Sequence, residues 1–104
     1  MLELNTDNFA AEVEQSSGLV VIDLWGPQCA PCLALMPEVE KLAESYAGKV
    51  KFCKLNVVGN RRLCIQLKVM SVPTFLFYKD GECKARLTGD EVSVEAVKEK
   101  INTL

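Results

Sequence analysis

The pattern of apolar and polar positions changes period several times along the chain, and each change marks a predicted element. LVVIDLW at Leu19–Trp25 is apolar on both faces apart from Asp23, as expected of a central strand covered on both sides. From Cys29 or Ala30 to Ala47, apolar residues recur at helical spacing. The same criteria predict further strands at Leu2–Leu4, Lys49–Val57, Pro73–Tyr78 and Glu82–Leu87, and further helices from Asn5 or Thr6 to about Ser16, at Asn60–Lys68 and at Ser93–Asn102.

The predicted elements follow one another in the order β-α-β-α-β-α-β-β-α. Strands joined through helices come first, and a hairpin around Lys79-Asp80-Gly81 comes last. This order implies an α/β fold in which helices cover both faces of a mixed central sheet. A chain of 104 residues is long enough for one hydrophobic core but not for two, so we expect a single domain over residues 1–104.

Composition and charge narrow the classes of function. The formal net charge is −2, and acids and bases are interspersed, so neither nucleic acid nor an anionic membrane is an expected partner. The N-terminal residues lack the pattern of a signal peptide, and no apolar run has the length of a transmembrane helix. We therefore expect a cytoplasmic protein, and we expect it to be a monomer.

The chain has five cysteines and no histidine. An odd number of cysteines argues against a structural disulfide framework, and the lack of histidine excludes Cys–His catalysis and every His-containing metal site. Two cysteines form a CxxC motif directly after the central strand. The others fall in three separate predicted elements, where we expect structural packing, with the last on the inward face of its strand: Cys53, Cys64 and Cys83.

Three interpretations compete for Cys29-Ala30-Pro31-Cys32. In the first interpretation, the two cysteines are simply small buried residues, although Cys29 follows a Gly-Pro turn outside any apolar periodicity. A zinc or iron–sulfur site is another, but no second CxxC pair completes four ligands. A dithiol that cycles with a disulfide is favoured by the βαβ context. Cys29 would then be the nucleophile, because unpaired N–H groups at a helix N-terminus favour its thiolate, and Cys32 would resolve the mixed disulfide.

Asp23 is an acid inside an apolar strand, which costs free energy unless it is paired or protonated. It precedes the CxxC motif by one short turn, so its side chain could lie beneath Cys32. With a raised pKa it would accept the proton of Cys32 at the resolving step. A structural ion pair with Lys54, in the neighbouring predicted strand, is the second interpretation. The two are compatible, because a nearby lysine would tune the acid.

Together these residues carry a family resemblance. VVIDLWGPQCAPC resembles the thioredoxin family, and the resemblance covers nearly the whole chain. It rests on far more than the CxxC motif. The matching positions are Asp23, Trp25, Cys29, Pro31, Cys32, the interior helical Pro37, the KLN of Lys54–Asn56, the VPT of Val72–Thr74, Gly81 and Gly89.

The resemblance implies a thioredoxin fold and a docking surface for disulfide substrates. Val72–Pro73 would be a cis peptide bond facing the disulfide, on which a substrate strand docks through backbone hydrogen bonds. Trp25 and Gly89 would complete the apolar surface around Cys29. The implied partners are protein disulfides and a thioredoxin reductase as electron donor, and no bound cofactor is expected.

Two departures from the family pattern affect the site. Ala30 replaces the glycine of CGPC, and Gln28, at the border of the docking surface, stands where a second Trp is expected. Ala30 and Pro31 lie between the cysteines and would tune the reduction potential. Oxidising relatives typically carry His between the cysteines, so its absence favours a reductant.

The expected function is therefore that of a protein disulfide reductase that cycles a Cys29–Cys32 disulfide. The alternatives are a non-catalytic binding module with the same fold and a metal carrier using the same CxxC surface. Reductase activity and the metal content of the purified protein distinguish the three.

Overall fold

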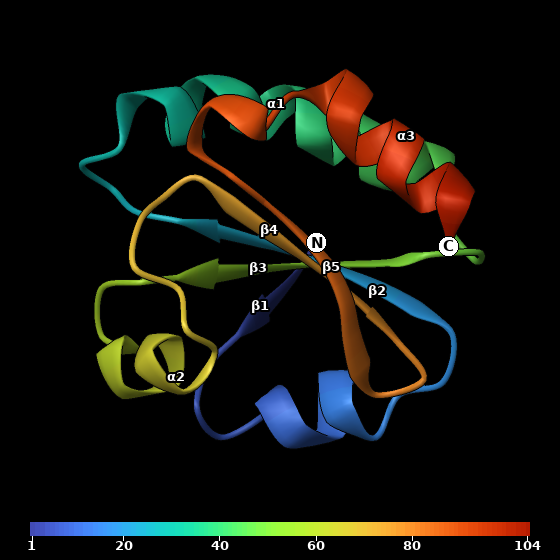
Figure 1. Ribbon diagram of the computed structural model, residues 1–104, viewed down its shortest axis with the longest axis horizontal. Helices are drawn as coiled ribbons and strands as arrows, with labels where there is room; N and C mark the ends of the chain where they lie inside the picture. The colour runs from blue at the N-terminus through green and yellow to red at the C-terminus, as the bar shows by residue number, and fades with distance from the viewer.

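Five strands form one mixed sheet across the middle of the molecule (Figure 1). The structure is a computed structural model that describes residues 1–104. In spatial order the strands run β1-β3-β2-β4-β5. The first three, β1, β2 and β3, are mutually parallel, whereas β4 is antiparallel to both β2 and β5. Their bounds are β1 Leu2–Leu4, β2 Leu19–Trp25, β3 Lys51–Asn56, β4 Thr74–Lys79 and β5 Glu82–Thr88.

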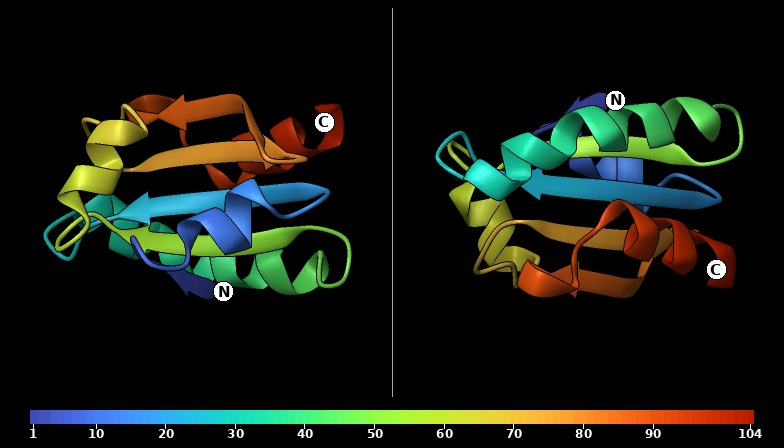
Figure 2. Two further views of the ribbon diagram at one scale, coloured as in Figure 1. Left: turned by 90° about the horizontal axis from the view of Figure 1, so that it is seen from below. Right: turned by 90° about the horizontal axis from the view of Figure 1, so that it is seen from above.

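Helices cover both faces of this sheet, which confirms the predicted fold class. Helices α1 (Ala30–Ser45) and α3 (Val94–Thr103) lie on one face, and α2 (Arg61–Gln66) and a short π-helical turn, η1 (Ala10–Glu14), lie on the other (Figures 1 and 2). A 3-10 turn, η2 (Gly89–Glu91), links β5 to α3. The side chain of Ser93 caps α3 by accepting a hydrogen bond from the Ala96 N–H at 3.0 Å.

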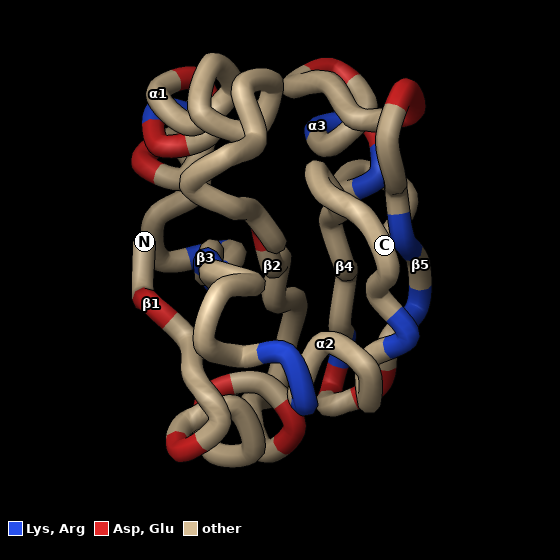
Figure 3. The backbone as a smooth tube through the Cα atoms, turned by 90° about the vertical axis from the view of Figure 1, so that its left-hand side faces the viewer, with Lys and Arg blue, Asp and Glu red and all other residues tan.

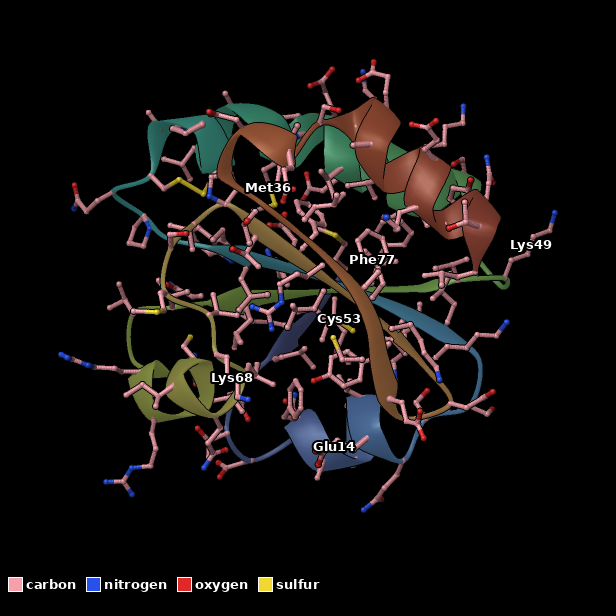
Figure 4. All side chains as sticks on the ribbon, in the orientation of Figure 1. Glu14, Met36, Lys49, Cys53, Lys68 and Phe77 are labelled. Atoms are coloured by element: carbon pink, nitrogen blue, oxygen red, sulfur yellow. A yellow bond between two sulfur atoms is a disulfide. The ribbon has the colours of Figure 1, made fainter.

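The strict alternation of β2 divides the apolar core into two layers, one on each side of the sheet. Val20, Ile22 and Leu24 pack with residues of β1, β3, η1 and α2. Val21 points to the opposite layer, which is filled by side chains such as Phe77 beneath α1 and α3 (Figure 4). Because side chains in a strand alternate, Asp23 projects into the same layer as Val21. The acid therefore faces the side of the sheet that α1 covers.

The N-terminal helical segment is shorter than the sequence pattern predicts. The continuous helical element is only the π-helical turn Ala10–Glu14. The segment before it is a turn that begins at Asn5, whose side chain accepts hydrogen bonds from the Asp7 and Asn8 N–H groups and whose carbonyl oxygen accepts from the Phe9 N–H at 3.1 Å. Phe9 and Val13 are nevertheless buried together, as expected. One short helical turn is therefore enough to bury the apolar face of this segment.

The inward position predicted for Cys83 is wrong, because a β-bulge interrupts the β4–β5 hairpin. Tyr78 pairs with Cys83, but Phe77 pairs with Ala85, so Lys84 is an extra residue on β5. One extra residue turns the preceding side chains to the opposite face. Ala85 and Leu87 keep their contacts in the α1–α3 layer, whereas Cys83 is exposed on the other side of the edge strand.

Candidate active site at the start of helix α1

The turn between β2 and α1 holds the two cysteines of the CxxC motif together. The Cys29 N–H donates to the Gly26 carbonyl oxygen at 3.1 Å, which closes the turn, and α1 begins at the next residue. Cys29 and Cys32 are joined by a disulfide, with their Cα atoms 5.2 Å apart. Pro31 sits in the first turn of α1, where a missing N–H costs nothing.

The two sulfur-bearing residues differ in exposure. Cys29 is partly exposed, whereas Cys32 is only 2% exposed. The Cys29 Sγ also caps α1 by accepting a hydrogen bond from the Cys32 N–H at 3.3 Å. A thiolate at this position would receive that hydrogen bond and the positive end of the helix dipole. An incoming disulfide therefore meets Cys29 first.

Asp23 is buried in β2, with 3% of its surface exposed. Desolvation raises the pKa of its carboxyl to about 7, and the nearby charge of Lys54 limits the rise. Lys54 lies directly opposite Asp23 in the β2–β3 register, but the two side chains form no ion pair, and no protein group donates a hydrogen bond to the carboxyl. A carboxyl that titrates near neutrality on the α1 side of the sheet is suited to proton transfer.

A groove runs beside the disulfide and brings four of the predicted site residues together. It has a volume of about 480 Å³. The peptide bond between Val72 and Pro73 is cis, and the Gly89 N–H donates to the Pro73 carbonyl oxygen at 3.0 Å. Three separate segments thus meet in one groove, whose lining is Pro31, Leu35, Val72, Pro73, Gly89, Asp90 and Val92.

Other predicted site residues lie outside this groove. Gln28 is exposed in the turn before α1, and Ala30 is exposed in the first turn of α1. Lys54 is the neighbour of Asp23 on the adjacent strand β3. Trp25 ends β2, where its carbonyl oxygen accepts from the Val57 N–H at 2.9 Å, and its own Nε1–H is buried without an acceptor. These residues border the disulfide turn or support it rather than line the groove.

A second cavity, of about 370 Å³, lies between α2 and the segment before β4, and we call it the α2 pocket. It shares Val72 with the groove. The sequence patterns did not predict this pocket, although Val58 and Met70, two large apolar residues outside any predicted periodic face, were a visible signal. The lining residues are Val57, Val58, Gly59, Arg61, Cys64, Val69, Met70, Ser71 and Val72.

The structure brings no group of three or more His, Cys, Asp or Glu side chains into an arrangement that could hold a metal ion. None of its helices combines the length and the apolar character needed to cross a membrane.

Comparisons with known proteins agree with this geometry. The family model described as Thioredoxin matches residues 1–103. A thioredoxin of Acetoanaerobium sticklandii is 41% identical over 103 residues, covering 96% of this chain and 98% of the relative. A thioredoxin of Peptoclostridium acidaminophilum is 41% identical over 97 residues, covering 93% and 88%. A thioredoxin of Haemophilus influenzae is 37% identical over 89 residues, covering 86% and 83%.

Proposed function

The chain belongs to the thioredoxin family, and from that premise we propose that it acts as a reductant of protein disulfides, with Cys29 as nucleophile, Cys32 as resolving thiol and Asp23 as proton acceptor. As a member of the family it is a dithiol–disulfide oxidoreductase that carries electrons through its CxxC disulfide. The observation that carries the assignment of roles is the contrast between a partly exposed Cys29 and a buried Cys32 at the start of α1.

The first step is attack by the Cys29 thiolate on one sulfur of a substrate disulfide. A mixed disulfide forms between Cys29 and the substrate, and the other substrate sulfur leaves as a thiolate. The groove supports this step, because a substrate strand lying along Val72 and Pro73 would bring its disulfide to the exposed side of Cys29. Burial keeps Cys32 from attacking the substrate disulfide in place of Cys29.

The second step releases the substrate. Asp23 accepts the proton of the Cys32 thiol, and the resulting thiolate attacks the Cys29 sulfur. The Cys29–Cys32 disulfide forms, and the second substrate sulfur leaves as a thiolate, which then takes up a proton. Two electrons have then passed from the protein to the substrate. A pKa near 7 supports this role, because such a carboxyl can both take up and return a proton at neutral pH.

A further partner must return the protein to its dithiol form, since the second step leaves it oxidised. We assign this to a thioredoxin reductase, and we expect the protein to work as a monomer. The cytoplasm remains the expected compartment, because three cysteines are unpaired, as is usual where thiols are kept reduced: Cys53, Cys64 and Cys83.

Trapping of substrates tests the order of attack. Cys32→Ser should accumulate mixed disulfides with protein substrates, because the Cys29 adduct can no longer be resolved. Cys29→Ser should trap almost none, since Cys32 is buried. The adducts are counted by non-reducing electrophoresis and mass spectrometry after rapid acid quenching. Equal trapping by both variants would overturn the assignment of roles.

A further inference from the structure

We propose that the α2 pocket holds an apolar side chain of a partner protein and that carboxylates beside this side chain pair with the arginines at the start of α2. The inference rests on the proposed function, because the pocket extends the surface on which disulfide partners dock. It goes further by naming the chemistry of the partner segment, which is apolar with acidic neighbours.

The apolar character of the pocket is the first argument. Met70 is 98% exposed and Val58 is 62% exposed, although both are large apolar side chains. They flank a cavity whose inner wall includes Val57, Val69 and Val72. Apolar surface gathered around a cavity marks a place where another molecule excludes water. At about 370 Å³, the pocket is at the small end of the range for binding sites, which suits a single large side chain.

The distribution of charge around the pocket is the second argument. No Asp or Glu occurs from Asn56 through Tyr78, although the chain as a whole is slightly acidic. The same segment carries Arg61, Arg62 and Lys68, and none of these forms an ion pair within the molecule. Figure 3, viewed from the end that carries the disulfide turn, shows the basic residues at the start of α2 and along β5.

These free cations favour an acidic partner. Arg61 lines the pocket itself, and Arg62 is exposed beside it in sequence. A guanidinium pairs readily with a carboxylate because its N–H groups match both oxygens, and at an interface rim such pairs mainly speed encounter and select partners. An apolar side chain flanked by carboxylates would therefore fill the cavity and pair with the arginines at its rim.

The walls of the pocket are held in place before any partner arrives. Arg86 on β5 donates to the carbonyl oxygens of Leu67 and Lys68 at 2.9 and 2.8 Å, which fixes the chain that leads into Val69 and Met70. Thr74 Oγ1 donates to the Ser71 carbonyl oxygen at 2.7 Å. Side-chain hydrogen bonds also fix the opposite wall, from Asn60 Nδ2 to the Asn56 carbonyl oxygen at 2.8 Å. A preformed pocket loses little conformational entropy on binding.

Continuity with the groove links the pocket to catalysis. Val72 lines both cavities, so one partner segment can lie along Val72–Pro73 and place a nearby side chain in the α2 pocket. The disulfide under attack and the acidic–apolar element then belong to the same segment of the partner. Partners with this element should be reduced faster than partners without it.

Three disulfide-linked peptide dimers test the proposal. Each peptide carries one cysteine, a four-residue Gly-Ser spacer and a C-terminal tripeptide, which is Glu-Leu-Glu, Gln-Leu-Gln or Glu-Ser-Glu. The second-order rate constant of reduction by the reduced protein is measured from the peptide thiol released, at low salt and at about 0.5 M salt, where surface charges are screened. The neutral 2-hydroxyethyl disulfide, too small to reach the pocket, reports on the redox reaction alone.

Two variants distinguish the contribution of the charged rim from that of the apolar wall of the pocket. The double variant Arg61→Gln, Arg62→Gln removes the cationic rim, and Met70→Ser removes the most exposed apolar wall. Lys98→Gln is the control for a charge lost away from the pocket, because it removes one positive charge from α3 on the other face of the sheet. All variants should reduce 2-hydroxyethyl disulfide at the rate of the unmodified protein.

The unmodified protein should reduce the Glu-Leu-Glu dimer about three- to tenfold faster than the Gln-Leu-Gln dimer at low salt. This advantage should vanish at high salt and in the double arginine variant, and it should persist in Lys98→Gln. Met70→Ser should slow both leucine-containing dimers relative to Glu-Ser-Glu. Equal rates for the three dimers in the unmodified protein would overturn the proposal, and so would a double variant that slows all of them alike.

Failure of the proposed function is recognised separately. A reduced protein that leaves 2-hydroxyethyl disulfide intact is not a general disulfide reductant. The pocket is then tested by binding of the same three peptides, with serine in place of cysteine, through the fluorescence of Trp25, the single tryptophan. Tightest binding of the Glu-Leu-Glu peptide supports the proposal, and equal binding of all three overturns it.

Discussion

At the scale of single residues, the pair Asp23 and Lys54 shows how burial sets chemistry. The sequence places an acid in an apolar strand and a lysine in its neighbour, and the structure sets them opposite each other without an ion pair. The carboxyl consequently keeps most of its desolvation penalty and has a pKa of about 7. A close ion pair would instead have held the acid ionised, which would remove its ability to accept a proton.

Replacement of Asp23 by asparagine tests its role in proton transfer. Asp23→Asn keeps the shape of the side chain but accepts no proton, so Cys32 must lose its proton to water. We expect resolution of the mixed disulfide to slow by about 10²-fold, the lower end of general base catalysis, while initial attack by Cys29 stays unchanged. Stopped-flow measurement of both phases checks this. Resolution at the normal rate would leave Asp23 with no catalytic part.

At the scale of elements, regular patterns were predictable and local irregularities were not. The bounds of β2 follow from its short continuous apolar run. The succession of the other strands and helices follows mainly from alternating and helical patterns, each of which buries one consistent face. The exposed position of Cys83 depends on one extra residue in β5, and alternation read from sequence assumes that no such residue exists. The identity of the cysteine pair needed only local spacing, because both residues lie on one helical turn.

The α2 pocket illustrates a different limit. Its lining comes from two separate turns and a helix, so the cavity exists only once β3, α2 and β4 are assembled. Val58 and Met70 carry no periodic signal, and whether such residues are buried depends on tertiary contacts. The family resemblance pointed to the groove beside the disulfide. Of the residues that line the α2 pocket, only Val72 belongs to the motifs on which that resemblance rests.

The turn of the β4–β5 hairpin offers an element-scale prediction. Gly81 has a positive φ of 85°, and a Cβ there would collide with the backbone carbonyl of Glu14. Gly48 has a nearly equal φ of 83° but faces open space. Both Gly81→Ala and Gly48→Ala should cost about 1 kcal/mol through backbone strain. The collision should make Gly81→Ala worse by a further 1–3 kcal/mol, roughly the cost of overpacking.

Denaturant unfolding of the two variants measures this difference. The midpoint should fall further for Gly81→Ala than for Gly48→Ala, with similar slopes. Equal midpoints would mean that the hairpin turn moves away from η1 at little cost, and that the contact between them contributes little to stability.

At the scale of the whole molecule, Asp23 makes stability depend on pH. Its folded pKa of about 7 exceeds the ordinary value of 3.8, so folding takes up a proton between these limits. The stabilising contribution of the Asp23 carboxyl is fully present below its ordinary pKa. It is lost as the pH rises through the pKa of the folded protein. At about 1.36 kcal/mol per unit, the free energy of unfolding should fall by a few kcal/mol across this window.

Denaturant unfolding of the oxidised protein from about pH 4 to pH 8 tests this dependence, with Asp23→Asn as the comparison. Other carboxyls affect both proteins alike, so the difference between the two curves isolates Asp23. The variant should gain stability relative to the unmodified protein as pH rises. A difference that stays constant with pH would show that the carboxyl does not change its ionisation on folding within this range.

The bulge in β5 has a practical consequence for work with this protein. In the oxidised form Cys29 and Cys32 are bonded to each other, and burial raises the pKa of the Cys53 thiol to about 11 and also raises that of Cys64. Cys83 is then the one exposed thiol, so the native oxidised protein should take up one maleimide label and the unfolded oxidised protein three. A dye or a surface tether attached there would sit on the sheet edge and leave the disulfide turn free.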